Sequence, residues 1–449
     1  MFNKSFSVLV SKKIKKYKKS ISVDSDKSIS IRSFLIASIS HNISKVKNVL
    51  ESEDVFAAIK CLKKLGVKIK KDKPKSYLVY GKGLGSLICR KNTVLNFENS
   101  GTLCRLLIGI MATTPNIQVK ITGDSSLRKR NMSKLINLMS EFGASFLPKN
   151  KSYLPLKLIS SEMPVGIDYK SGVSAQLKSA VILAGLNSYG KTIIEEKSMS
   201  RDHTERMLLN STGVIKVKKN KKKIIEVSGK SHLFPLNIDV GGDPSSAAFF
   251  VALTLLNKNS SLKIKNVNLN PTRIGFYELL KKHGAKINFK NIKKINNEPR
   301  GEVIVKSSNL KPFKSPVSFY VKSTDEFPIL FCLAGLINGT SIFKGVGELV
   351  NKESNRIKEM QKILKQIGIK SFAGKDQLKI FGRSVIKKSN KVIRVPNLKD
   401  HRICMSAVIL SLITGIKANI KNFETVNTSA PSFLRTVKSI GGNFEIKKK

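Results

Sequence analysis

Six glycines, each lying between a helical stretch and a short alternating stretch, constrain the fold of this chain most strongly. The intervals between consecutive glycines are 77, 70, 71, 84 and 73 residues. Glycine ends a helix readily because it adopts the left-handed conformation without steric cost. A near-regular repeat of this length therefore predicts six copies of one α/β unit. The six are Gly66, Gly143, Gly213, Gly284, Gly368 and Gly441.

A second set of helices is expected between these copies, so that each unit carries two helices and several strands. The Gly/Asp-rich stretch 239–244 separates the third copy from the fourth and predicts a domain boundary there. A chain of 449 residues is long enough for two or more domains with full cores. The expected helices cover 32–40, 102–112, 174–186, 245–256, 326–337 and 402–414.

The net charge of +52 is unusual and would ordinarily suggest a nucleic-acid partner. Of the 82 basic residues, however, 68 are lysines spread along the whole chain, and aromatic residues do not alternate with them. We interpret the charge as compositional drift toward lysine, and an RNA-binding protein stays only as an alternative.

Cysteine spacing and hydropathy predict the compartment. The five cysteines form no CxxC pair and no metal-binding spacing, which indicates buried free thiols in a reducing compartment and no metal site. The apolar runs are too short or interrupted to span a bilayer, and no secretory signal is recognised. We therefore expect a cytoplasmic protein.

Most polar motifs begin helices and carry cations. In the stretch 26–32, Asp26 is a plausible N-cap that would place Lys27 and Ser28 in the first turn and Arg32 one turn later. Free N–H groups, an ammonium and a guanidinium at a helix start would hold a phosphate or carboxylate. A capped helix with solvated cations is the alternative. Six of the 14 arginines lie in such motifs: Arg32, Arg105, Arg130, Arg201, Arg356 and Arg402.

Carboxylates are scarce in these motifs. Asp325 and Glu326 precede a very apolar run, which makes them either an acid–base pair or a simple helix cap. Glu353 lies beside Lys352 and Arg356, which are four residues apart and are expected on one helical face. The motifs together predict a substrate pair with several negative charges and proton transfer by one or two carboxylates.

In its order of motifs, the chain closely resembles the 5-enolpyruvylshikimate-3-phosphate synthase family, in a form similar to the family's second class. The motifs follow the family order over nearly the whole sequence, with departures such as Asn355 where the family often has Asp. The matching stretches are DKSISIR (26–32), NSGTLCR (99–105), GDSSLRKR (123–130), SAQLKSA (174–180), SRDHTERM (200–207), GGDPSSAAFF (241–250), NPTRIG (270–275), DEFP (325–328), KESNRI (352–357) and DHR (400–402).

This resemblance implies a two-domain inside-out α/β barrel, each domain built from three βαβαββ repeats. One domain would comprise 24–242, and the other 1–23 with 243–449, with the active site in the cleft between them. The implied reaction transfers the enolpyruvyl group of phosphoenolpyruvate to the 5-hydroxyl of shikimate 3-phosphate through a tetrahedral intermediate. The resemblance implies no cofactor, a monomer and no nucleic-acid or membrane partner.

Site residues follow from the resemblance by matching position. The catalytic groups would be Asp325, as base on the 5-hydroxyl, and Glu353 with Lys27 for the methylene proton. The expected ligands of shikimate 3-phosphate are Lys27, Ser28, Arg32, Ser174, Ala175, Gln176, Ser200, Arg201, Asp325 and Lys352. The expected ligands of phosphoenolpyruvate are Lys27, Gly101, Arg130, Gln176, Arg356 and Arg402.

The closest alternative is the sister enolpyruvyl transferase that acts on a UDP-amino sugar. That family has Lys-Asn at the first motif and a reactive cysteine in a mobile loop. This chain has Lys27-Ser28 at the first motif and no cysteine in the third motif, so the shikimate enzyme is the favoured interpretation.

Overall fold

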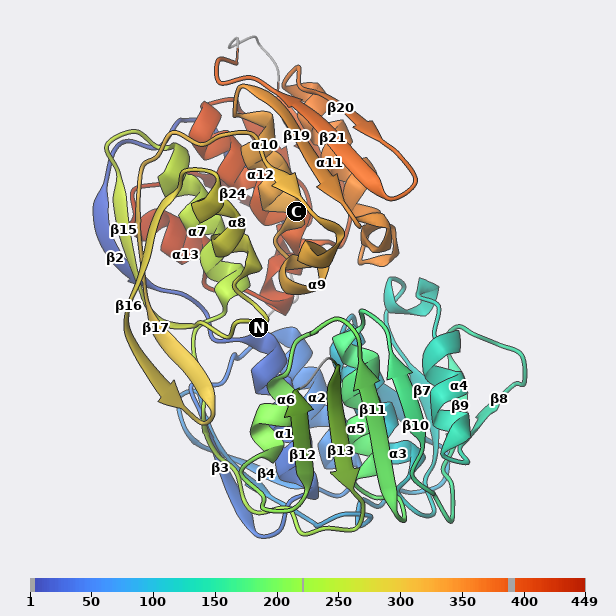
Figure 1. Ribbon diagram of the computed structural model, residues 1–449. Coiled ribbons are helices and arrows are strands. Elements are labelled where there is room, and N and C mark those ends of the chain that lie inside the picture. The colour runs from blue at the N-terminus through green and yellow to red at the C-terminus, as the bar shows by residue number, and fades with distance from the viewer. Residues whose placement is uncertain (1–4, 220–221, 387–391, 449) are drawn as a thin grey trace. The chain divides into compact units, whose positions relative to one another are not determined.

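The computed structural model describes residues 5–219, 222–386 and 392–448 (Figure 1). The chain divides into two compact units, each assembled from separate stretches of sequence. Unit 1 comprises Met1–Asp24, Gly241–Lys293 and Pro299–Lys449, and unit 2 comprises Ser25–Val240 and Lys294–Glu298.

Unit 2 contains three four-stranded sheets of one topology. In each sheet the first strand is parallel to the second, and the remaining pairs are antiparallel. The repeat in chain order is βαβαββ, as in β6, α3, β7, α4, β8 and β9. The sheets, in spatial order, are β14 (Asn237–Asp239), β3 (Ile43–Lys47), β5 (Ser76–Tyr80), β4 (Lys68–Lys73); β6 (Thr93–Asn96), β7 (Gln118–Thr122), β9 (Leu156–Ile159), β8 (Ser145–Leu147); and β10 (Asp168–Ser171), β11 (Lys191–Glu196), β13 (Lys223–Ser228), β12 (Ile215–Lys219).

The helices of unit 2 are of two kinds. The first helix of each repeat is almost fully buried, which is the pattern of a core helix. The second is amphipathic with an exposed face in α2 and α4, whereas α6 is short and mostly buried. Core helices are α1 (Lys27–Ile39), α3 (Gly101–Ala112) and α5 (Ala175–Gly185); the others are α2 (Glu53–Lys64), α4 (Ser133–Glu141) and α6 (His203–Leu208).

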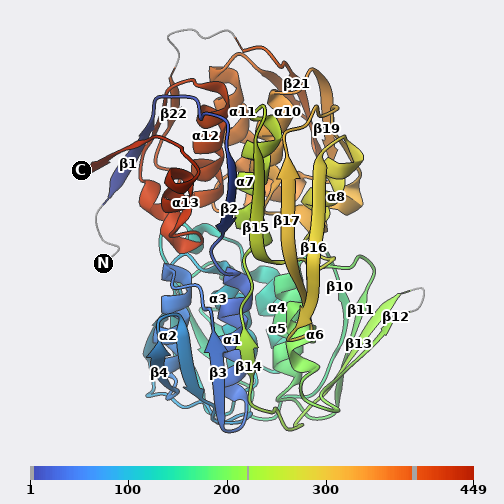
Figure 2. The ribbon, with the colours of Figure 1, turned by 90° about the vertical axis from the view of Figure 1, so that its left-hand side faces the viewer.

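Unit 1 repeats the same sheet topology three times. Its N-terminal strands complete two of the sheets: β2 lies beside β15 (Figure 2), and β1 lies between β23 and β24. The sheets are β16 (Lys286–Ile295), β17 (Glu298–Lys306), β15 (Ser261–Asn268), β2 (Lys18–Ser22); β18 (Lys314–Ser315), β19 (Gly339–Lys344), β21 (Gln377–Gly382), β20 (Lys370–Ala373); and β22 (Ile393–Val395), β23 (Ala418–Ile420), β1 (Phe6–Val10), β24 (Glu445–Lys448).

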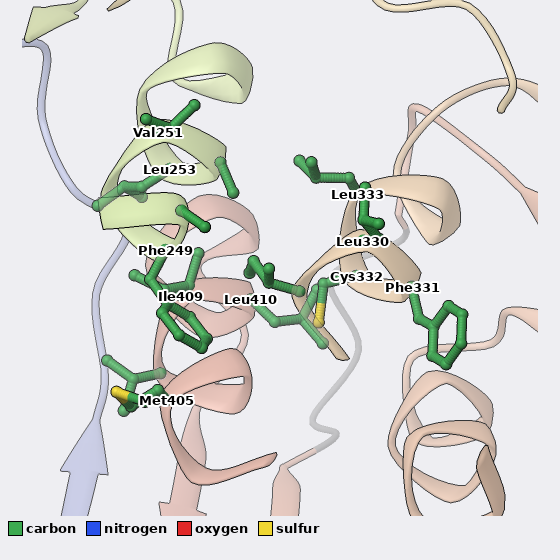
Figure 3. Close-up of a cluster of buried hydrophobic side chains, with 14 of the residues drawn as sticks. Phe249, Val251, Leu253, Leu330, Phe331, Cys332, Leu333, Met405, Ile409 and Leu410 are labelled. Atoms are coloured by element: carbon green, nitrogen blue, oxygen red, sulfur yellow. The ribbon is translucent and has the colours of Figure 1, made fainter. Parts of the chain in front are cut away.

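Three apolar helices form the core of unit 1. Figure 3 shows side chains of these helices directed toward one another, with Phe249, Cys332 and Leu410 as examples from each. All nine residues of α10 are buried. The core helices are α7 (Pro244–Leu256), α10 (Phe327–Gly335) and α12 (His401–Thr414); the others are α8 (Gly275–Lys282), α9 (Tyr320–Ser323), α11 (Arg356–Gln366) and α13 (Phe433–Ser439).

The predicted role of the repeat glycines is confirmed. All six have a positive φ, between 79° and 97°, and a strand follows each one. Gly213 differs from the other five in its distance from the helix, because α6 ends at Leu208 and the glycine lies in the turn that follows. A left-handed residue thus separates helix from strand in every repeat.

Two further expectations concern cysteines and the membrane. Cys61, Cys104, Cys332 and Cys404 are buried free thiols, as predicted, whereas Cys89 is only half-buried. Burial raises the pKa of the Cys104 thiol to about 12, so that thiol stays protonated at neutral pH. Among the described residues, the helices are all too short or too polar to cross a bilayer.

Candidate active site

The start of α1 in unit 2 is the predicted anion cradle. Asp26 is the N-cap, fully buried, and its carboxylate accepts a hydrogen bond of 2.8 Å from the Ile29 N–H. Lys27 follows, with its Nζ 2.9 Å from the Asp54 carboxylate at the start of α2. The Lys27 side chain is 17 % exposed, so its ammonium is oriented by an acid yet remains within reach of solvent.

Arg32 lies one turn into α1 and is 2 % exposed. Its Nη1 donates to both the carbonyl and the hydroxyl of Ser28. Its Nε donates to the Thr204 hydroxyl at 2.9 Å, and its Nη2 donates to the Ser179 hydroxyl at 3.1 Å. The planar guanidinium is therefore fixed in orientation by residues from three helices.

A second group of cations surrounds the start of α3. A Cβ atom added to Gly101 would lie 2.7 Å from Nη1 of Arg105 and 2.7 Å from Nη1 of Arg130. Arg130 is held by the Asn99 side chain, whose Oδ1 accepts from Nη2 at 2.6 Å. Two guanidinium groups thus meet over the glycine at a helix N-terminus, where the helix dipole also attracts anions.

Gln176 on α5 connects to this group. Its Oε1 accepts from Arg105 Nη1 at 3.0 Å, and its Nε2 donates to the Thr102 hydroxyl at 2.9 Å. Ser174 is the N-cap of α5 and accepts from the Leu177 N–H, while Ala175 is the first residue of the helix. The starts of α3 and α5 are therefore linked through side chains within unit 2.

Ser200 and Arg201 precede α6. Ser200 is buried, and both its N–H and its hydroxyl donate to the Glu196 carboxylate, at 2.8 and 2.6 Å. Arg201 follows with a half-buried side chain. His203 is buried, and its Nδ1 lies 2.6 Å from the carboxylate of Glu298, 95 positions later in the chain.

The predicted residues of unit 1 gather around Arg356, which is 1 % exposed. Its Nε lies 3.0 Å from Asp400, its Nη2 lies 2.6 Å from Glu353, and its Nη1 lies 3.7 Å from Asp325. Burial disfavours the charged guanidinium, but the carboxylates of Asp400, Glu353 and Asp325 outweigh it and raise the pKa of Arg356. The cation is therefore permanent.

Arg402 is the second residue of α12, close to the N-cap Asp400, and is 3 % exposed. Asp400 is the N-cap, and its carboxylate accepts from the Arg402 N–H at 3.0 Å. Within the described residues, the buried Nε and Nη1 of Arg402 and the Nη1 of Arg356 have no hydrogen-bond partner. Unsatisfied buried donors of this kind are costly and call for an acceptor, which an anionic ligand would supply.

The structure separates the two adjacent acids at 325–326. Glu326 is buried and accepts from the Ser245 hydroxyl, whereas the Asp325 side chain is 24 % exposed and faces Arg356. The interpretation of both as one acid–base pair is therefore wrong, because Glu326 is part of the packed interior. Of the two acids, Asp325 is the one that faces Arg356.

The expected helical pairing of Lys352 with Arg356 is also wrong. Asn355 caps α11 by accepting from the Lys358 N–H, so the helix begins at Arg356 and Lys352 lies before it. The Lys352 ammonium instead lies 5.8 Å from the centre of the Tyr320 ring. A cation over an aromatic face is held in place while it remains available to an anion.

Three polar residues that contact predicted site residues within their own unit were missed as functional candidates. Asp54 pairs with Lys27, Arg105 approaches Gly101, and Asp400 orients Arg356 and caps α12. Arg105 and Asp400 lie in recognised motifs, which is a signal that could have found them. Asp54 lies 27 residues after its partner, on another helix, and the sequence carries no comparable signal.

Solved structures share this architecture. The enolpyruvyl transferase NikO from Streptomyces tendae aligns over 99 % of this chain and 100 % of its own, with a TM-score of 0.75 and 14 % identity, which shows the fold alone. The fold is thus that of the enolpyruvyl transferases, and the predicted two-domain α/β architecture is confirmed.

Closer similarity defines the family. EPSP synthase from Acinetobacter baumannii aligns over 98 % of this chain and 100 % of its own, with a TM-score of 0.84 and 32 % identity. The profile of EPSP synthase (3-phosphoshikimate 1-carboxyvinyltransferase) matches residues 11–437. This chain therefore belongs to the EPSP synthase family.

Curated relatives agree with this assignment. A 3-phosphoshikimate 1-carboxyvinyltransferase from Zymomonas mobilis is 37 % identical over 98 % of this chain and 97 % of its own. Another from Thermodesulfovibrio yellowstonii is 39 % identical over 94 % of this chain and 97 % of its own. The favoured interpretation of the sequence, a transferase of aromatic amino acid biosynthesis, is confirmed over the UDP-amino-sugar enzyme and the RNA-binding protein.

Proposed function

We propose that this chain transfers the enolpyruvyl group of phosphoenolpyruvate to the 5-hydroxyl of shikimate 3-phosphate, using the groups described above. The observation that carries the assignment of residues is the set of unsatisfied buried guanidinium donors on Arg356 and Arg402. Such donors gain hydrogen-bond acceptors when an anion binds, and the two substrates together carry two phosphates and two carboxylates. Family membership supports the reaction itself.

The groups around α1 are proposed to hold shikimate 3-phosphate. Lys27, Ser28 and Arg32 offer an ammonium, a hydroxyl and a guanidinium within two turns of one helix. The starts of α5 and α6 would add Ser174, Ala175, Gln176, Ser200 and Arg201, and unit 1 would add Asp325 and Lys352. Several charge-assisted hydrogen bonds of this kind suit a dianionic phosphate.

The second set of cations is proposed to hold phosphoenolpyruvate. Gly101, Arg130 and Gln176 surround the start of α3, Arg356 and Arg402 belong to unit 1, and Lys27 would contact both substrates. The bare backbone of Gly101 allows an anion to approach the helix N-terminus closely.

The proposed chemistry is an addition followed by an elimination. Glu353 and Lys27 deliver a proton to the methylene carbon of phosphoenolpyruvate, and Asp325 takes the proton of the 5-hydroxyl as its oxygen bonds to the neighbouring carbon. The tetrahedral intermediate then loses phosphate and a methyl proton, which restores the double bond. Fixed cations stabilise the phosphate as it leaves.

The remaining properties are proposed from the family and the composition. The functional domains would be 24–242 and 1–23 with 243–449, and the protein would act as a cytoplasmic monomer on small-molecule substrates without nucleic acid. Phosphate release from phosphoenolpyruvate with shikimate 3-phosphate as acceptor tests the reaction. Release with a UDP-amino sugar as acceptor, and none with shikimate 3-phosphate, would overturn the proposal.

Replacing Gly101 with alanine is expected to raise KM for phosphoenolpyruvate about tenfold or more and leave KM for shikimate 3-phosphate within about threefold. The new methyl group would lie 2.7 Å from the guanidinium groups of Arg105 and Arg130, which would have to move. A lost hydrogen bond to a charged group costs about 1.5–3 kcal/mol, which is a factor of about ten to a hundred. Steady-state kinetics with each substrate varied in turn measures the effect.

Gly374→Ala is the matched control, because its Cβ would meet only the flexible side chain of Gln377, at 3.2 Å. This variant should keep both KM values within about twofold of the parent. An unchanged KM for phosphoenolpyruvate in Gly101→Ala would contradict the placement of this substrate at the start of α3.

A further inference from the structure

Two consecutive residues of α5 contact two consecutive residues of α6 in unit 2, through one ion pair and one hydrogen bond. Lys178 and Ser179 lie on α5, and Thr204 and Glu205 lie on α6. The Lys178 ammonium is 2.8 Å from the Glu205 carboxylate, and the Thr204 hydroxyl donates to the Ser179 hydroxyl at 2.9 Å. All four residues are at most 2 % exposed.

An ion quartet fixes the register of these helices. Lys178 and Lys223 each contact both Glu196 and Glu205, at distances of 2.8–3.1 Å. Burial raises the pKa of Glu196, but Lys178, the Ser200 hydrogen bonds and Lys223 outweigh burial and lower it. The two positive and two negative charges balance, and moving any helix would leave a charge buried without its partner.

This register brings two hydroxyl oxygens to one guanidinium. Thr204 Oγ1 donates its proton to Ser179, so its lone pairs face Arg32 Nε at 2.9 Å. Ser179 Oγ also accepts from Arg32 Nη2, at 3.1 Å. Hydroxyl acceptors set the orientation of a guanidinium without neutralising its charge, so the positive charge remains available to an anion.

The same quartet also holds a second residue of the proposed site. Glu196 accepts from the N–H and the hydroxyl of Ser200, while α6 begins three residues later. Ser200 and Arg32 come from different parts of the chain. Ser200 is positioned by Glu196, which contacts Lys178, and Arg32 is positioned by Ser179, the neighbour of Lys178.

We infer that Thr204 and Ser179 are positioning residues that orient Arg32 toward shikimate 3-phosphate, with the ion quartet of Lys178, Glu196, Glu205 and Lys223 holding them in register. This inference rests on the proposed assignment of Arg32 to shikimate 3-phosphate. Neither hydroxyl touches the substrate; each acts through the guanidinium.

Thr204→Val tests the inference, because valine has the shape of threonine without the hydroxyl. KM for shikimate 3-phosphate should rise about tenfold or more, because Arg32 Nε loses its acceptor and the guanidinium loses its orientation. KM for phosphoenolpyruvate and kcat should stay within about threefold. Thr204→Ser restores the hydroxyl and should return KM for shikimate 3-phosphate to within about threefold of the parent.

Ser33→Ala is the matched control. Ser33 is a buried hydroxyl on α1 beside Arg32, but it donates to the Ile29 carbonyl of its own helix. This variant should leave both KM values within about twofold. Circular dichroism establishes that each variant is folded, and Ser179→Ala, which removes the other acceptor, replaces Thr204→Val if the valine variant does not fold.

Arg32→Lys distinguishes a failure of the positioning inference from a failure of the proposed assignment of Arg32 to shikimate 3-phosphate. An unchanged KM for shikimate 3-phosphate in folded Thr204→Val, with a raised KM in Arg32→Lys, overturns the positioning inference and leaves the proposed site intact. An unchanged KM in both variants overturns the assignment of Arg32 and the inference with it. An equal rise in KM for both substrates in Thr204→Val indicates a general structural effect and also overturns the inference.

Discussion

Asp325→Asn is expected to lower kcat by about 10²–10⁴-fold, the range for loss of a positioned general base. Asparagine keeps the size of the side chain but cannot take the proton of the 5-hydroxyl. Arg356 keeps its contacts with Asp400 and Glu353, so the fold and KM for phosphoenolpyruvate should change little. Fixed-time assays of phosphate release at saturating concentrations of both substrates measure kcat.

Glu359→Gln is the control for this variant. Glu359 is a carboxylate on α11 of the same unit, paired with Lys362, and it lies outside the cation cluster. Its replacement should keep kcat within about twofold. A loss of less than tenfold in Asp325→Asn would remove Asp325 from the role of base.

Arg402→Met should raise KM for phosphoenolpyruvate by about a hundredfold or more. The change removes two buried N–H donors that have no partner among the described residues, and each hydrogen bond to an anion is worth about 1.5–3 kcal/mol. Because Arg402 lies at the positive end of α12, its charge is unfavourable in the free protein. The midpoint of thermal unfolding should therefore stay the same or rise as affinity falls.

Arg394→Met provides the comparison, since Arg394 is an exposed arginine on β22 of the same unit. Both KM values and the unfolding midpoint should match the parent within error. A lower unfolding midpoint in Arg402→Met, together with an unchanged KM for phosphoenolpyruvate, would make Arg402 a structural residue and would refute its proposed role.

The repeat was predictable because its signals are local. A glycine at the end of a helix reports a backbone that must turn left-handed, and helices such as α10, apolar on every side, can only be core helices. Asp26 as the N-cap of α1 is equally local, since its acceptor bond is made to a residue three positions later. These properties depend on neighbours within one turn of the chain.

The different surroundings of the two acids at 325–326 could not be predicted from the local sequence. Adjacent carboxylates before an apolar run look equivalent in sequence, yet Glu326 meets Ser245, 81 residues away, and Asp325 faces Arg356. Which of the two is buried depends on how α10 packs against α7, and the sequence pattern carries no information about that packing.

The sequence alone predicted the repeat, the core helices and most residues of the cation clusters, because helix capping and apolar periodicity act over a few residues. Tertiary structure alone decided how those cations are held: Arg32 by Thr204, 172 positions away, Arg356 by Asp400, 44 positions away, and Lys27 by Asp54. A hydrogen bond or ion pair forms between atoms within about 3 Å of each other, and only the folded chain determines which distant residues come that close.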